Sequence, residues 1–137
     1  SRYGRGLPTG QAVATTAGNL PANWVVHTVG PVWSASEDRS WMLRDCYANS
    51  LRVADELGAT SVAFPLISAG VYRWPVEDAV RQALTVLGAA HPATVSSARL
   101  VLFDAATHAT ATRVRQRLPT GPPPVGDGGP EDSGRPA

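Results

Sequence analysis

The spacing of hydrophobic positions changes along the chain between two residues and about 3.6 residues, which predicts alternating strands and helices. Runs rich in β-branched and aromatic residues predict strands over 11–16, 24–29, 61–67 and 98–103. Apolar residues at helical spacing predict amphipathic helices over 37–57, 75–87 and 106–118. Strands and helices in alternation are typical of a layered α/β domain, in which the apolar run 61–67 is expected to be a central strand covered on both faces.

Composition limits this architecture to one small domain, predicted over residues 1–118. Of the last 19 residues, 119–137, 11 are proline or glycine, so a disordered tail without its own core is expected there. All 12 basic residues are arginine and they nearly balance 11 acidic ones, which gives no general attraction to nucleic acids or to acidic membranes. A single cysteine, Cys46, and no long apolar run predict a cytoplasmic protein without an internal disulfide.

The segment 64–75 is the most informative part of the sequence, because an apolar strand leads through a small-residue turn into a helix that begins at Pro75. Helix first-turn amides lack intrahelical partners, so this arrangement predicts a cradle for a phosphate group. Ser68 offers a hydroxyl, and Gly70 lets the backbone approach a diphosphate. Tyr72 and Trp74 offer ring faces for a ribose or a base, whereas the other three tryptophans, Trp24, Trp33 and Trp41, are predicted to be packing residues.

A second strand-to-helix loop, 104–107, follows the strand that ends at Phe103. In open α/β sheets, ligands bind where the carboxyl ends of parallel strands meet. If the two strands are neighbours, both loops line one crevice, with Phe103 and Asp104 at its rim.

Several short motifs, in this order, resemble the macro domain family, and the branch of ADP-ribosyl hydrolases in particular. They are Pro8-Thr-Gly-Gln-Ala12, Asn19-Leu-Pro21, Val26-His-Thr-Val-Gly-Pro31, Cys46-Tyr47 with Asn49-Ser50-Leu51, Val62-Ala-Phe-Pro65 and Ser68-Ala-Gly-Val-Tyr72. The resemblance covers about Leu7 to Leu118. It implies a three-layer α/β/α fold with a mixed central sheet and a cleft for ADP-ribose or ADP-ribosylated protein, with no cofactor and no metal.

Carried over residue by residue, the resemblance assigns ligand binding to the loop after the third predicted strand and to one aromatic residue. These residues are Ser68, Ala69, Gly70, Val71, Tyr72 and, on the adenine side, Phe103. Two positions differ from the family pattern, since Ala69 replaces a threonine and Arg73 a glycine. The guanidinium of Arg73 is therefore a further candidate for diphosphate binding through a charge-assisted contact.

The family's opening strands, its adenine-reading aspartate and its water-positioning glycine-rich loop have no match upstream of Pro8. This predicts an N-terminally truncated domain with an exposed apolar sheet edge and little stability in reserve. The catalytic residues stay unassigned, and so does the oligomeric state. Three functions remain open: a hydrolase of ADP-ribosyl bonds or of O-acetyl-ADP-ribose in a complete form, an ADP-ribose reader without turnover, or a degenerate fragment without a ligand.

A different enzyme class would use Ser68 as a nucleophile, His27 or His108 as its base and Asp104 to orient that base. The sequence disfavours it, because Ser-Ala-Gly lacks the nucleophile elbow Gly-x-Ser-x-Gly. His27 is better read as a hydrogen-bonded strand residue and Cys46 as a small hydrophobe. Three scattered histidines and one cysteine show no metal-ligand spacing.

Overall fold

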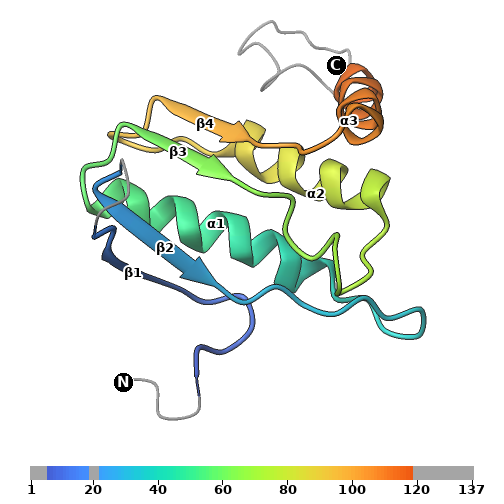
Figure 1. Cartoon of the computed structure of the whole chain (residues 1–137), viewed down its shortest axis with the longest axis horizontal. Helices are drawn as coiled ribbons and strands as arrows, with labels where there is room; N and C mark the ends of the chain where they lie inside the picture. Colours follow the sequence, from blue (N-terminus) through green and yellow to red (C-terminus); the bar gives the residue numbers. More distant parts are fainter. Residues whose placement is uncertain (1–5, 19–21, 119–137) are drawn as a thin grey trace, which may run out of the picture.

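The computed structural model describes residues 6–18 and 22–118, which alternate between strands and helices as the sequence pattern predicts (Figure 1). The elements are β1 (Ala12–Thr16), β2 (Trp24–Thr28), α1 (Ser40–Glu56), β3 (Ser61–Phe64), α2 (Val76–Ala89), β4 (Ser97–Leu100) and α3 (Ala105–Arg117). The predicted tail, 119–137, and the turn residues 19–21 lie outside the described residues. Within the described part of the chain, no helix is long and apolar enough to cross a bilayer.

The described strands form two separate two-stranded sheets. β1 and β2 pair antiparallel in a register from Ala12 opposite Thr28 to Thr16 opposite Trp24. β3 and β4 pair parallel, from Ser61 beside Ser97 to Phe64 beside Leu100. Figure 1 shows β2 and β3 pointing in the same direction on either side of α1, which connects them.

The strand after α1 is shorter than predicted, because local chemistry ends it early. β3 stops at Phe64 rather than at Ile67, since Pro65 has no N–H to donate and the Ile67 amide donates to the Tyr47 hydroxyl at 2.9 Å. The prediction of burial on both faces is also wrong for the described residues, where Ser61 and Ala63 are exposed. One face of β3 alone contributes to the core.

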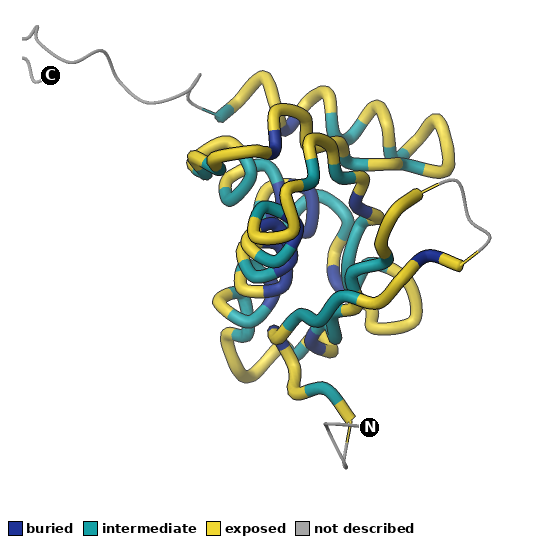
Figure 2. The backbone as a smooth tube through the Cα atoms, turned by 90° about the vertical axis from the view of Figure 1, so that its left-hand side faces the viewer, coloured by how far each residue is buried: buried dark blue, intermediate teal, exposed yellow. Residues whose placement is uncertain are grey.

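The core lies where α1 packs against the strands and α2, and Figure 2 shows its buried positions gathered at the centre of the fold. The predicted apolar face of α1 is confirmed, since its inward positions are buried. They are Leu43, Cys46, Tyr47, Ser50, Leu51 and Ala54. The Tyr47 and Phe64 rings lie 5.4 Å apart between centroids. Burial of each large apolar side chain of this kind stabilises a fold by about 1.5–3 kcal/mol.

The four tryptophans are distributed differently from the prediction. Trp74, expected to offer its ring to a ligand, is only 2% exposed and belongs to the core. The three predicted packing residues are all partly exposed: Trp24 by 38%, Trp33 by 40% and Trp41 by 54%. Trp33 makes an edge contact with Trp74 at a centroid distance of 5.2 Å. Sequence pattern alone does not distinguish these environments, because each residue is flanked by similar mixtures of polar and apolar neighbours.

The carboxylate of Asp55, near the end of α1, holds the turn that leads into β4. It accepts backbone N–H groups from Thr94 at 2.6 Å, Ala93 at 3.0 Å and Val95 at 3.0 Å. The Thr94 hydroxyl also donates to it, at 2.9 Å. These donors favour the ionised form, and the Thr94 amide above all, so the pKa of Asp55 falls from 3.8 to about 2.

Stability is therefore expected to depend on pH through Asp55. Because the folded-state pKa is lowered, the contribution is present above pH 4 and is lost as pH falls from 3.8 towards about 2. Asp55→Asn should be less stable than the parent chain at pH 7, and the difference should shrink across that acid range. Urea unfolding at a series of pH values measures this. The control is Glu56→Gln. Glu56 is next to Asp55 in sequence, but its only ion pair in the described part of the chain is an exposed one with Arg52, so this variant should show no comparable effect. A parent–variant difference that stays constant from pH 7 to pH 2 would contradict the assignment.

Candidate functional site

The loop between β3 and α2 is tied to distant parts of the chain at several points. The Tyr47 hydroxyl, buried under the loop, accepts the Ile67 amide at 2.9 Å and donates to the Pro65 carbonyl at 3.3 Å. Burial raises the pKa of this phenol, which keeps it protonated and able to donate. The Ser68 hydroxyl donates to the Pro31 carbonyl at 2.7 Å. These bonds fix the start of the loop against α1 and the segment after β2.

The end of the loop is fixed as well. The Trp74 amide donates to the Ser68 carbonyl at 2.9 Å, and the Trp33 amide donates to the Tyr72 carbonyl at 2.8 Å. Ser68 and Arg73 both have positive φ angles, 68° and 66°, so the backbone turns sharply at each side of residues 69–72. The loop is therefore anchored at both of its ends by bonds within the chain itself.

The tip of this loop presents backbone donors to solvent. Within the described residues, no hydrogen bond uses the amides of Gly70, Val71 or Tyr72. Gly70 has open space on its Cα, with no atom within 4 Å of where a Cβ would stand. Val71 is 90% exposed. Successive unbonded amides in a fixed turn are a typical binding site for an anion such as a phosphate.

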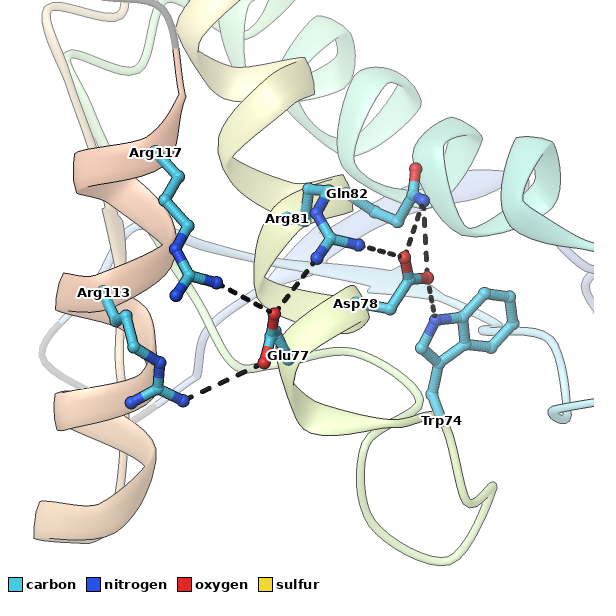
Figure 3. Close-up of polar contacts among 7 residues, drawn as sticks. All are labelled: Trp74, Glu77, Asp78, Arg81, Gln82, Arg113 and Arg117. Carbon is cyan, nitrogen blue, oxygen red and sulfur yellow. Dashed lines mark hydrogen bonds and ion pairs between the residues drawn. The ribbon is translucent and has the colours of Figure 1, made fainter.

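The N-terminus of α2 offers less to an anion than the sequence predicted. Pro75 is the N-cap residue, and the first turn carries Glu77 and Asp78. Figure 3 shows these two carboxylates facing a group of donors from α2, α3 and the loop. Those partners are Arg81, Gln82 and Trp74 for Asp78, and Arg81, Arg113 and Arg117 for Glu77. The helix dipole is already matched by protein carboxylates, so a bound phosphate would be held by loop amides and not by the helix end.

The structure places the predicted ligand-binding residues on two neighbouring loops. Residues 68–73 form one loop, in which Ala69 packs against the core while Tyr72 and Arg73 are exposed. Phe103 follows β4 and is 87% exposed. Because β3 and β4 are adjacent and parallel, their carboxyl ends meet at one edge of the sheet, as the sequence analysis required for a shared crevice.

The alternative serine-nucleophile arrangement is not formed. The Ser68 hydroxyl donates to Pro31, and His27 contacts the Thr15 hydroxyl at 2.9 Å. Asp104 is the N-cap of α3 and accepts the Thr107 amide at 2.7 Å, which lowers the pKa of its carboxyl. Ser68, His27 and Asp104 therefore each have another partner.

Cys46 is buried, and its thiol donates to the Val29 carbonyl at 3.3 Å. Burial raises the pKa of the thiol, which suits a packing residue and not a nucleophile. Among residues 6–18 and 22–118, no three His, Cys, Asp or Glu side chains gather in a way that could hold a metal ion.

Sequence reasoning missed Gly30 as a part of this site. A Cβ on Gly30 would collide with the Ser68 Oγ and stand 2.7 Å from the Ile67 Cγ2. The close approach brings the segment after β2 against the loop and permits the bond from Ser68 to Pro31. The Gly-Pro pair was visible in the sequence as the end of a strand and of the motif 26–31, but not as a contact of the loop.

Gly30→Ala is expected to destabilise the fold by about 1–3 kcal/mol, the usual cost of adding a methyl group to a packed contact. The loop must move away from Pro31, so the Ser68 bond is strained or lost. Urea unfolding measures the effect. Gly88→Ala in α2 is the matched control, since nothing lies within 4 Å of its Cβ position and alanine favours a helix. Equal stability of the two variants would show that the contact at Gly30 is not tight.

Comparison with known proteins gives a consistent result. The model of the family described as "Macro domain" matches residues 1–83. A macro domain-containing protein of Streptomyces nogalater is 60% identical over 116 residues, which are 85% of this chain and 62% of that protein. One from Streptomyces coelicolor is 65% identical over 102 residues, 74% of this chain and 60% of that protein. The O-acetyl-ADP-ribose deacetylase of Escherichia coli is 58% identical over 69 residues, which are 50% of this chain and 39% of the enzyme.

Solved structures support the same relationship. A macrodomain of Oceanobacillus iheyensis with ADP superposes with a TM-score of 0.75 at 31% identity, covering 80% of this chain and 59% of that one. A variant of this macrodomain with ADPR gives the same TM-score at 30% identity, with 80% and 60% coverage. The α/β fold class that the sequence predicted is confirmed. The chain spans about three fifths of the length of the first two relatives.

Proposed function

Since this chain belongs to the macro domain family, we propose that it binds ADP-ribose, or an ADP-ribosyl group on a protein, through the loop 68–73. The observation that carries the proposal is the set of three consecutive amides, Gly70 to Tyr72, that no group in the described residues uses. These amides lie on a loop that bonds of Tyr47, Ser68 and Trp74 anchor. Binding a ligand therefore requires little further ordering of the loop, and the entropy lost on binding is small. The macrodomain structures with ADPR and with ADP add support from relatives.

In this proposal, the two phosphate groups of the ligand accept hydrogen bonds from the loop amides. Gly70 keeps the approach free of side-chain atoms. Arg73, exposed at the end of the loop, supplies a permanent positive charge next to the diphosphate. The exposed ring of Phe103 offers a stacking surface for the adenine at the same edge of the sheet.

We propose hydrolysis of ADP-ribosyl bonds or of O-acetyl-ADP-ribose as a second function, for a complete form of the domain. The similarity to O-acetyl-ADP-ribose deacetylase over half of this chain favours it. The role of this chain's loop would be to bind the diphosphate and orient the reacting bond towards water. Binding and turnover are separate claims, so each requires its own measurement.

Calorimetric titration with ADP-ribose tests the binding proposal, after circular dichroism has verified that the chain is folded. AMP and ribose 5-phosphate are the controls, because each carries one phosphate and one end of the ligand. We expect ADP-ribose to bind more tightly than either fragment. A folded chain that binds none of the three, or binds AMP equally well, would contradict recognition of the diphosphate and distal ribose.

A further inference from the structure

The first turn of α2 contains two adjacent carboxylates that face different partners (Figure 3). Glu77 faces α3, where guanidinium nitrogens of Arg113 and Arg117 lie 3.9 Å and 3.7 Å from its oxygens. Asp78 faces the end of the candidate loop and accepts the Trp74 Nε1–H at 2.9 Å. Among the described contacts of these two carboxylates, the bond of Asp78 is the one that reaches the loop.

Trp74 closes this loop with its backbone. Its amide donates to the Ser68 carbonyl at 2.9 Å, and the Arg73 amide donates to the Gly70 carbonyl at 3.0 Å. Arg73 has a φ angle of 66°, so the chain turns sharply just before Trp74. Because the Trp74 side chain and this turn share one backbone, a change in the orientation of the ring shifts the turn and, with it, the amides of residues 70–72.

The packing around the Trp74 ring does not by itself fix its orientation. The residue is only 2% exposed, and the Trp33 ring meets it edge-on at a centroid distance of 5.2 Å. The torsion that orients an aromatic ring on its Cβ is broad and roughly two-fold, so apolar contacts leave two orientations. A buried indole N–H needs an acceptor, and only the orientation that directs it at Asp78 supplies one.

The Asp78 carboxylate is itself held in place. Arg81 donates to its Oδ1 at 2.9 Å, and the Gln82 Nε2 lies 3.4 Å from both of its oxygens. The Gln82 Oε1 in turn accepts a bond from Arg44 of α1 at 2.9 Å. The Asp78 side chain is 28% exposed. Asp78 is therefore a fixed acceptor, connected through Gln82 to α1.

The negative charge of Asp78 opposes the binding of an anion at this end of α2. A carboxylate in the first turn matches the helix dipole and repels a diphosphate nearby. A charge effect alone therefore predicts that ADP-ribose binds more tightly after Asp78 is removed. An effect through Trp74 predicts weaker binding, so the two explanations differ in sign.

We propose that Asp78 is a positioning residue of the ADP-ribose site. By accepting the Trp74 indole N–H, it holds the amides of residues 70–72 in the arrangement that a diphosphate requires. The start of the loop has its own anchors in Tyr47 and Ser68, and Asp78 acts on the other end. The inference rests on the proposed function, because its main measure is the affinity for ADP-ribose.

Calorimetric titration with ADP-ribose tests the bond from both sides. Asp78→Ala removes the acceptor and Trp74→Phe removes the donor, and we expect each to weaken binding by about fivefold or more. Asp78→Asn keeps an acceptor oxygen and should bind within about twofold of the parent chain. Unchanged or tighter binding by Asp78→Ala would overturn the proposal, and so would a loss in Asp78→Asn equal to that in Asp78→Ala.

The double variant distinguishes a shared bond from two separate effects. If the two side chains act through their bond, Asp78→Ala should cause no further loss of affinity in a chain that already carries Trp74→Phe. Additive losses would contradict the proposal. All titrations are made at a temperature at which circular dichroism shows every variant to be folded, so that a loss of stability is not read as a loss of affinity.

Glu77→Ala is the matched control for the loss of a carboxylate. It removes the same charge from the same turn, but Glu77 has no described contact with Trp74. This variant should bind ADP-ribose at least as tightly as the parent chain. A loss of affinity as large as that in Asp78→Ala would assign the effect to the charge of the turn and would overturn the role of the bond.

The ligand-free chain separates this inference from the proposed function. NMR relaxation and chemical shifts of the Gly70, Val71 and Tyr72 amides should show a more mobile loop in Asp78→Ala than in the parent chain or in Glu77→Ala. Unchanged spectra of these amides would overturn the positioning role. A parent chain that does not bind ADP-ribose would overturn the proposed function, while the NMR comparison would still decide whether Asp78 orders the loop.

Discussion

Gly70→Glu is expected to abolish ADP-ribose binding, lowering affinity at least about a hundredfold. The glutamate places a carboxylate among the amides of residues 70–72, where the proposed diphosphate must lie. Like charges brought together in a binding site cost several kcal/mol, and each 1.4 kcal/mol is a factor of ten in Kd. Calorimetric titration of the variant with ADP-ribose measures the loss. The fold should persist, because the Cβ position is open and the φ angle of Gly70 is not positive.

Gly88→Glu is the matched control for this charge change. Gly88 lies near the end of α2, also with open space around its Cβ position, and far along the chain from the loop. It should bind ADP-ribose as the parent chain does. Gly70→Ala separates volume from charge, and we expect it to weaken binding much less than glutamate. Unchanged affinity in Gly70→Glu would show that these amides do not hold the diphosphate.

The secondary structure could be predicted where its cause is local. The buried face of α1 follows from apolar residues at helical spacing, and the structure buries those positions from Leu43 to Ala54. The ends of the strands were harder to predict from the sequence, because they depend on hydrogen-bond partners in other parts of the chain. β3 ends where Pro65 and the Tyr47 hydroxyl take over the backbone, and the pattern of apolar residues continues past that point to Ile67.

The candidate loop was also visible in the sequence, since its small residues and their place between a strand and a helix are local features. Its anchors were not. Both residues stand in motifs of the family resemblance, but the pattern otherwise shows Tyr47 as one more apolar helix position and Gly30 as the end of a strand. Both act on the loop only because folding brings α1 and the segment after β2 against it. The sequence shows the acidic first turn of α2, Glu77 and Asp78. It does not show that Arg113 and Arg117 of α3 pair with Glu77, so that this helix end is already occupied by protein charges and has little to offer a bound anion.

Trp74→Ala should destabilise the fold by about 3–5 kcal/mol, the range for removing a large buried aromatic side chain. Trp74 is only 2% exposed, its ring contacts Trp33, and its Nε1 donates to the Asp78 carboxylate at 2.9 Å. The truncation leaves a cavity at the point where the loop joins α2. A domain with 5–15 kcal/mol of stability would lose a large part of it, and urea unfolding monitored by circular dichroism would show the midpoint fall.

Trp41→Ala is the control for loss of a tryptophan, since Trp41 is 54% exposed and its removal should change stability by less than about 1 kcal/mol. Trp74→Phe keeps most of the buried ring but not the donor to Asp78, so an intermediate loss is expected. The contrary outcome is specific: a Trp74→Ala chain as stable as the parent, with weaker ADP-ribose binding, would assign the ring to the ligand after all. In that case the burial of Trp74 between Trp33 and Asp78 would have to open when the ligand binds.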